Sequence, residues 1–193
     1  ARLADPAPRT GTPGAPVLSV NGVRASDRSG LRDIAIDGLT VRAGEIVGIA
    51  GISGNGQMEL MELLTGQRPR AAGEILVKGA PYDATREEAR IRCVRYLPEE
   101  PLHNACAARM SVTENIAFRS FDLNGKGTRF WLSGREMRAR AADLVAAFKV
   151  KTASLDSPMA SLSGGNVQRA VLARELTGDV DLLVISNPCF GLD

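Results

Sequence analysis

The sequence is poor in residues that several classes of site require. Aromatic residues make up only 4% of its 193 residues, whereas proteins that stack nucleic-acid bases need aromatic side chains on their surface. The 24 lysines and arginines are scattered and nearly balanced by 22 acidic residues, so no nucleic-acid partner is expected. The single histidine, His103, excludes any mechanism that needs two.

Cysteine and long apolar runs are also scarce. The three cysteines, Cys93, Cys106 and Cys189, are odd in number and far apart. This spacing argues against a disulfide framework or a zinc site, and it favours a reducing compartment. No apolar run approaches the roughly 20 residues of a membrane span, and no secretory signal is recognised. The remaining composition is that of a globular domain.

Apolar patterning predicts strands and helices after a linker at residues 1–16, which are rich in Pro, Gly, Ala and Thr. Ser111 followed by Glu114 predicts a capping box. The continuously apolar run 45–50 predicts a strand buried on both faces. The order of the predicted strands and helices along the chain indicates an α/β fold with an inserted helical subdomain. Strands are expected at 17–20, 34–41, 45–50, 73–79, 92–97 and 181–186, and helices at 58–65, 111–119, 135–148 and 165–177.

A glycine-rich loop follows the run 45–50 and opens a helix, the usual setting of a phosphate-binding loop. Its spacing matches G-x-x-x-x-G-K-[ST], except that Gln57 stands at the Lys position and Met58 at the Mg²⁺-binding hydroxyl. A neutral amide cannot neutralise phosphate charge, and a thioether is a poor ligand for a hard cation. An ordinary strand–helix turn is the alternative. The predicted nucleotide-binding residues are Gly51, Ser53, Gly54, Asn55, Gly56, Gln57, Met58 and Glu59.

A second glycine motif, LSGGN at 162–166, precedes the last predicted helix, with Ser163 placed as its N-cap. With the GNGQ loop upstream, it makes the chain resemble the nucleotide-binding domain of ABC transporters, whose signature is LSGGQ. The LSGGN form resembles the second, degenerate C-terminal cassette of tandem sugar and nucleoside importer ATPases. The resemblance implies a P-loop NTPase-type ABC ATPase core with a mixed sheet and an inserted helical subdomain.

The resemblance also implies how the chain divides into domains and subdomains. Residues 17–108 are expected to form the first part of the ATP-binding core, with the degenerate phosphate loop and the Q-loop. The helical subdomain is expected at 109–160. The signature helix and a degenerate Walker B strand, which ends at the D-loop, are expected at 161–193. Because the family's fold continues past the D-loop, we expect a fragment truncated there.

Further roles follow from the resemblance. Ser186 replaces the Asp that organises Mg²⁺, and Asn187 replaces the Glu that polarises the attacking water, so general-base chemistry is lost. Glu99 stands at the Q-loop position, which contacts the membrane subunit. The residues expected at a partner's ATP are Leu162, Ser163, Gly164, Gly165, Asn166 and Gln168. The expected D-loop residues, which contact a partner cassette, are Gly191, Leu192 and Asp193.

Other conspicuous residues are expected to be structural. His103 is placed in a solvated loop, and Cys93 and Cys189 are expected to pack in the interior. Phe130 and Trp131 are expected to anchor the helical subdomain. The arginines of 86–95 are expected to form a solvated face, with Glu87 and Glu88 as local partners: Arg86, Arg90, Arg92 and Arg95.

The implied function is asymmetric, because family cassettes dimerise head to tail around ATP. No catalytic residue of the chain's own site is intact, and it holds no metal ligand. ATP binding there is expected to be weak or absent, with Mg²⁺ held only through the partner cassette's site and ATPase activity near zero in isolation. The implied partners are a second cassette on the same polypeptide, transmembrane permease subunits and, indirectly, a solute-binding protein. The implied location is peripheral, on the cytoplasmic face of the inner or plasma membrane of a bacterium.

Three alternatives stay open. The domain could bind no nucleotide and only transmit motion to a membrane subunit, which the same substitutions support. A soluble relative acting on nucleic acid or ribosomes would carry basic or coiled-coil insertions, and the sequence shows none. A fully active ATPase would have to compensate for the loss of both metal ligands and the base.

Overall fold

The computed structural model describes residues 11–27, 29–30, 33–52, 54–120 and 133–187. The chain forms two compact units, Ala1–Arg92 (unit 1) and Cys93–Asp193 (unit 2), so both boundaries expected inside the C-terminal half, at 109 and 161, fall within unit 2. Several predictions lie outside the described residues: most of the linker, Ser53, Phe130, Trp131, Cys189 and the D-loop residues Gly191, Leu192 and Asp193.

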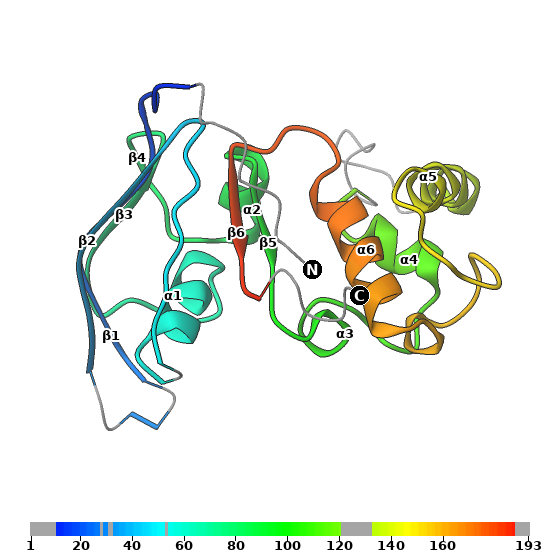
Figure 1. Ribbon diagram of the computed structural model, residues 1–193, viewed down its shortest axis with the longest axis horizontal. Coiled ribbons are helices and arrows are strands. Elements are labelled where there is room, and N and C mark those ends of the chain that lie inside the picture. The colour runs from blue at the N-terminus through cyan, green and yellow to red at the C-terminus, as the bar shows by residue number, and fades with distance from the viewer. Residues whose placement is uncertain (1–10, 28, 31–32, 53, 121–132, 188–193) are drawn as a thin grey trace, which may run out of the picture. The chain divides into compact units, whose positions relative to one another are not determined.

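Unit 1 is built on a four-stranded antiparallel sheet in the order β2-β1-β3-β4. The strands are β1 (Pro16–Ser26), β2 (Asp33–Arg42), β3 (Ala72–Val77) and β4 (Ala80–Pro81). Buried side chains alternate along β1 and face those of β3, as in the pairs Leu18–Val77 and Val20–Ile75. Figure 1 shows the helix α1 (Gln57–Leu64) on one side of this curved sheet. The strands expected at 17–20, 34–41 and 73–79 are confirmed.

Gly73 of β3 lies close against the backbone of β1. Its φ is +81°, and a Cβ there would lie 2.4 Å from the carbonyl oxygen of Gly22. We expect Gly73→Ala to lower the free energy of unfolding by about 2–3 kcal/mol, because both the backbone angle and the contact are unfavourable. Gly79, at φ +74° with no atom within 4 Å, is the control: Gly79→Ala should cost about 1 kcal/mol. Urea denaturation compares them, and equal losses would contradict the close contact.

The buried strand predicted at 45–50 is wrong. After the turn at Arg42, where the N–H of Glu45 donates to the Arg42 carbonyl at 3.1 Å, the segment runs as coil. Ile46 is 90% exposed and Ile49 is 55% exposed. An apolar run becomes a strand only where a neighbouring strand pairs with its N–H and C=O groups. In the described part of unit 1, β1 already pairs on both edges and no other strand pairs with this run.

Unit 2 combines two parallel strands with a small helical core. β5 (Val94–Leu97) pairs with β6 (Leu182–Ile185). The helices α4 (Val112–Ala117), α5 (Gly134–Ala147) and α6 (Gly164–Glu175) pack together (Figure 1). Their expected counterparts are confirmed, and so is the strand expected near 181–186. The shared core consists of Val112, Ile116, Ala141, Val150, Met159, Val167 and Ala170.

The predicted capping box starts α4. The Ser111 hydroxyl accepts from the N–H of Glu114 at 3.2 Å, and the Glu114 carboxylate accepts from the N–H of Ser111 at 2.8 Å. Hydrogen bonds from the Ser111 side chain, and then from its backbone, lower the pKa of Glu114. The charged carboxylate therefore contributes stability above its ordinary pKa, and this contribution is lost as the pH falls through the lowered folded-state pKa.

The stability that this capping box contributes to the protein is expected to depend on pH. Ser111→Ala is expected to cost about 1 kcal/mol near neutral pH, and less at acidic pH once the pH has fallen through the lowered folded-state pKa of Glu114. Ser133 offers a matched control, because its hydroxyl caps α5 by accepting from the N–H of Glu136 at 3.3 Å. The cost of Ser133→Ala should change less with pH. Chemical denaturation at neutral and at acidic pH checks this, and a constant cost for Ser111→Ala would contradict it.

The arginine-rich stretch contains a helix that the pattern missed, α2 (Arg86–Ile91), which opens on a Thr85–Glu88 capping box. Arg90 pairs with Glu87 at 2.5 Å, as predicted. Glu88 instead caps the helix, and Arg92 donates to the carbonyl of Pro81 at 2.8 Å. The solvated face is therefore confirmed only in part.

The histidine and the two cysteines that the structure describes have structural surroundings, on the surface or beside the core. His103 is exposed, but it lies on the short helix α3 (Pro101–Asn104) and not in a loop. Cys93 is half-buried at φ +52°. Burial raises the pKa of the Cys106 thiol to about 11, so this thiol is protonated at neutral pH and packs beside the core of unit 2.

Candidate functional site

The glycine loop of unit 1 turns directly into α1. Gly54 and Gly56 have φ values of +90° and +96°, which favour glycine, and Gly56 is the N-cap of α1. The Gln57 side chain folds back over the loop. Its Nε2 donates to the carbonyl of Ile52 at 3.3 Å, and it lies 2.2 Å from where a Cβ on Gly51 would stand.

These contacts test whether the loop suits a Mg²⁺-bound triphosphate. The Gln57 amide is occupied by the loop's own backbone, and Met58 presents a thioether that is 48% exposed. Glu59 adds a carboxylate in the first turn of α1, where a cation would be needed to balance phosphate charge. The residues present therefore fit an anion poorly and fit Mg²⁺ worse. Within the described ranges, no three His, Cys, Asp or Glu side chains gather as a metal site would.

The signature motif of unit 2 forms the start of α6. Ser163 is its N-cap by position, but the Ser163 hydroxyl accepts from the side-chain amide of Asn166 at 2.8 Å. The oxygen of that amide accepts from the N–H of Lys151 at 2.7 Å. Asn166 is thereby held on both sides, while Ser163 and Gly164 stay exposed. A Cβ on Gly164 would meet no atom within 4 Å, so the surface at the helix start is open.

The other predicted signature residues differ in their surroundings. Gly165 is half-buried in the first turn, and Leu162 packs against the core of unit 2. Gln168 lies one turn further along α6 and is 1% exposed, because the helical period turns it inward. Its side chain belongs to the interior of unit 2, and only the other five residues remain candidates for a surface contact.

The ends of β5 and β6 bring together residues that are far apart in the sequence. The parallel register pairs Leu97 with Ile185, and the N–H of Ser186 donates to the Leu97 carbonyl at 2.9 Å. One residue further on, the Asn187 amide donates to the Glu99 carboxylate at 3.2 Å. The predicted Q-loop and Walker B positions therefore meet. An amide at 187 suits this contact, because a second carboxylate there would repel Glu99.

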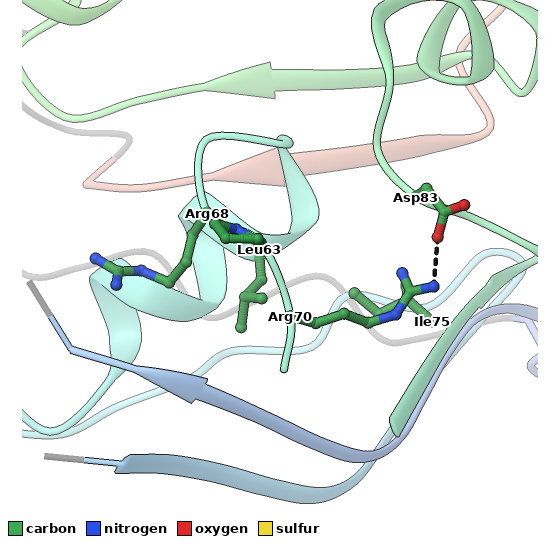
Figure 2. A pocket seen from close by; sticks show the side chains of 6 residues that line it. Leu63, Arg68, Arg70, Ile75 and Asp83 are labelled. Carbon is green, nitrogen blue, oxygen red and sulfur yellow. Dashed lines mark hydrogen bonds and ion pairs between the residues drawn. The ribbon is translucent and has the colours of Figure 1, made fainter. Parts of the chain in front are cut away.

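A hollow of about 300 Å³ lies elsewhere in unit 1. Figure 2 shows its two arginines pointing in opposite directions, Arg70 towards Asp83. Arg68 pairs with Glu62 at 2.7 Å. Both guanidinium groups already face a carboxylate, so little positive charge is left for an anion. None of the residues predicted from the sequence lines this hollow.

Comparisons with known proteins identify a family. A family profile described as "ABC transporter" matches residues 36–189. The glucose import ATP-binding protein TsgD13 of Haloferax volcanii is 41% identical over 94% of this chain and 34% of its own length. The guanosine import ATP-binding protein NupO of Bacillus subtilis is 33% identical over 96% of this chain and 36% of its own length. The chain thus spans about a third of the length of these curated relatives.

Solved structures share the fold. The dimeric ATP-binding cassette MJ0796, in a post-hydrolysis state bound to ADP and Pi, has a TM-score of 0.68 at 21% identity. The match covers 91% of this chain and 76% of that chain. The likeness confirms the expected α/β fold class. Among the described helices, none combines the length and apolarity that crossing a membrane requires.

Proposed function

Because this chain belongs to the ABC transporter family, we propose that it forms part of the ATP-binding protein of an importer for sugars or nucleosides. The family resemblance indicated by LSGGN and the glycine loop is confirmed. The solute class is supported by relatives named as glucose and guanosine import ATP-binding proteins. The assignment to a second, degenerate cassette is part of the proposal.

The contrast between the two glycine motifs carries the proposal. The open start of α6 exposes Ser163 and Gly164 beside a tethered Asn166. A partner cassette's ATP would meet this surface, since helix N-termini favour phosphate. The chain's own loop instead holds Gln57 on the Ile52 carbonyl. The proposed cassette therefore completes a partner's ATP site, and its own site is catalytically impaired and binds ATP weakly or not at all.

The proposed assembly follows from this asymmetry. The partner cassette belongs to the same polypeptide and holds the Mg²⁺. Permease subunits in the membrane contact the Glu99 region, and a solute-binding protein delivers the substrate to them. The protein lies at the cytoplasmic face of the membrane. Relatives about three times as long as this chain leave room for a second cassette.

A nucleotide-binding experiment tests the impaired site. In the full-length protein, the phosphate-loop lysine of the partner cassette is replaced, and labelled ATP is titrated. Binding weaker than about 1 mM and no Mg²⁺-dependent turnover are expected. Gln57→Ala should change neither result. Robust Mg²⁺-dependent turnover from the remaining cassette would overturn the proposal.

The second candidate is a module that binds no nucleotide at either motif and only transmits motion. It is favoured by the closure of the glycine loop on its own backbone through Gln57. It predicts that changes at Ser163 leave ATP turnover by the partner cassette intact, whereas the proposal above predicts a large loss.

A further inference from the structure

The signature helix α6 ends in a buried group of charges. The Glu175 carboxylate is 0% exposed, and it accepts from Arg174 at 2.8 Å and from Arg119 at 3.0 and 3.1 Å. A buried carboxylate needs such partners, because it has lost its hydration. Two guanidinium groups on one carboxylate fix its position from two directions, since their donors form a rigid fork.

Each arginine also reaches a different part of unit 2. Arg174 donates to the carbonyls of Ala105 at 2.9 Å and Asn115 at 3.2 Å, which ties the end of α6 to α4. Arg119 follows α4, and its guanidinium lies 5.1 Å from the centre of the Tyr96 ring. Tyr96 belongs to β5, whose end leads to Glu99. The group therefore links α6 to α4 and, through the Tyr96 ring, adds a contact to β5, which α6 also touches directly.

We propose that Arg119, Glu175 and Tyr96 are positioning residues that couple β5 to the signature helix. The inference rests on the proposed function, in which the start of α6 meets a partner's ATP. A straight helix of 12 residues carries a displacement of its Glu175 end to its Ser163 end, about 18 Å away. When β5, whose end lies beside Glu99, shifts, the Tyr96 ring moves with it. The ring then displaces Arg119, and the contact of Arg119 with the Glu175 carboxylate changes. Arg119 supplies one of the two guanidinium groups that hold Glu175, so a displaced Arg119 changes how the end of α6 is held.

Tyr96→Leu tests the ring contact, because it removes the ring beside Arg119 without removing any atom of the Arg119–Glu175 pair or of the Arg174 contacts. Tyr96→Phe is the matched control, since it keeps the ring that attracts the cation. In the full-length protein, hydrogen exchange by mass spectrometry then reports on peptides covering 163–168. We expect exchange there to rise about fivefold for Tyr96→Leu and to stay unchanged for Tyr96→Phe.

The places in the chain where hydrogen exchange rises distinguish a positioning role of these residues from a general role in stabilising unit 2. Faster exchange at 163–168 with an unchanged melting temperature and unchanged exchange at 134–147 supports the coupling. Exchange at 163–168 equal to that of the parent protein would overturn it, and so would a uniform rise throughout unit 2. Arg119→Lys, which keeps the charge but not the fork, should give an intermediate rise. The measurement needs no nucleotide, so its outcome is independent of whether α6 completes an ATP site.

Discussion

Ser163→Arg is expected to lower ATP turnover about 100-fold or more in the full-length protein assembled with its membrane subunits. Ser163 is exposed at the start of α6, and its hydroxyl is the acceptor for the Asn166 amide. A long side chain at this position fills the open surface and releases Asn166. Removal of a single aligned donor from a phosphate or oxyanion site already has an effect of this size. Steady-state phosphate release measures it.

Ser161 provides the control for this substitution. It lies two residues earlier, is also exposed, and its hydroxyl donates to the Pro158 carbonyl at 2.7 Å. Ser161→Arg adds the same bulk and charge next to the motif but outside it. Turnover within about twofold of the parent is expected. If both variants lose activity equally, general damage to unit 2 explains the result and the assigned role of the signature fails.

Glu175→Gln is expected to lower the free energy of unfolding by about 3–5 kcal/mol. The substitution keeps the volume of the side chain but leaves two guanidinium groups, Arg119 and Arg174, without their shared carboxylate. Arg174 is 6% exposed, so water cannot replace the lost partner. Urea denaturation followed by circular dichroism measures the loss.

The exposed ion pair of α2 provides the control for Glu175→Gln. Glu87 and Arg90 form an ion pair in which both side chains remain 45–65% exposed. Glu87→Gln should therefore cost less than about 1 kcal/mol. A loss from Glu175→Gln no larger than this would mean that the buried carboxylate contributes little to the stability of unit 2.

The features that the sequence predicted correctly have local causes. The capping box at Ser111 and Glu114 depends on residues three apart, and the turn at Gly56 needs only its own backbone angle. The same logic could have found α2, since Thr85 and Glu88 have the same spacing. The family itself was identified from two short motifs, whose spacing within each motif is also a local property.

The features that the sequence could not predict depend on contacts between distant residues. The run 45–50 is apolar enough for a buried strand, but strand formation requires a partner that periodicity does not reveal. Glu99 and Asn187 are 88 positions apart and meet only through the register of β5 and β6. Arg119 and Glu175 are separated by 56 positions. A charged side chain at 175 suggests the surface by its type, and only the fold shows it buried.

The exposed isoleucines that precede α1 affect how this chain behaves when handled alone. Ile46, Ile49 and Ile52 present apolar surface on a backbone with which none of the described strands of unit 1 pairs. Such a strip combines exposed hydrophobic side chains with backbone that lies outside the sheet, and both properties promote association between molecules. Concentrated preparations of the 193-residue chain should bind hydrophobic dyes and scatter light, and a charged residue in place of Ile46 would be the first change to make for soluble expression.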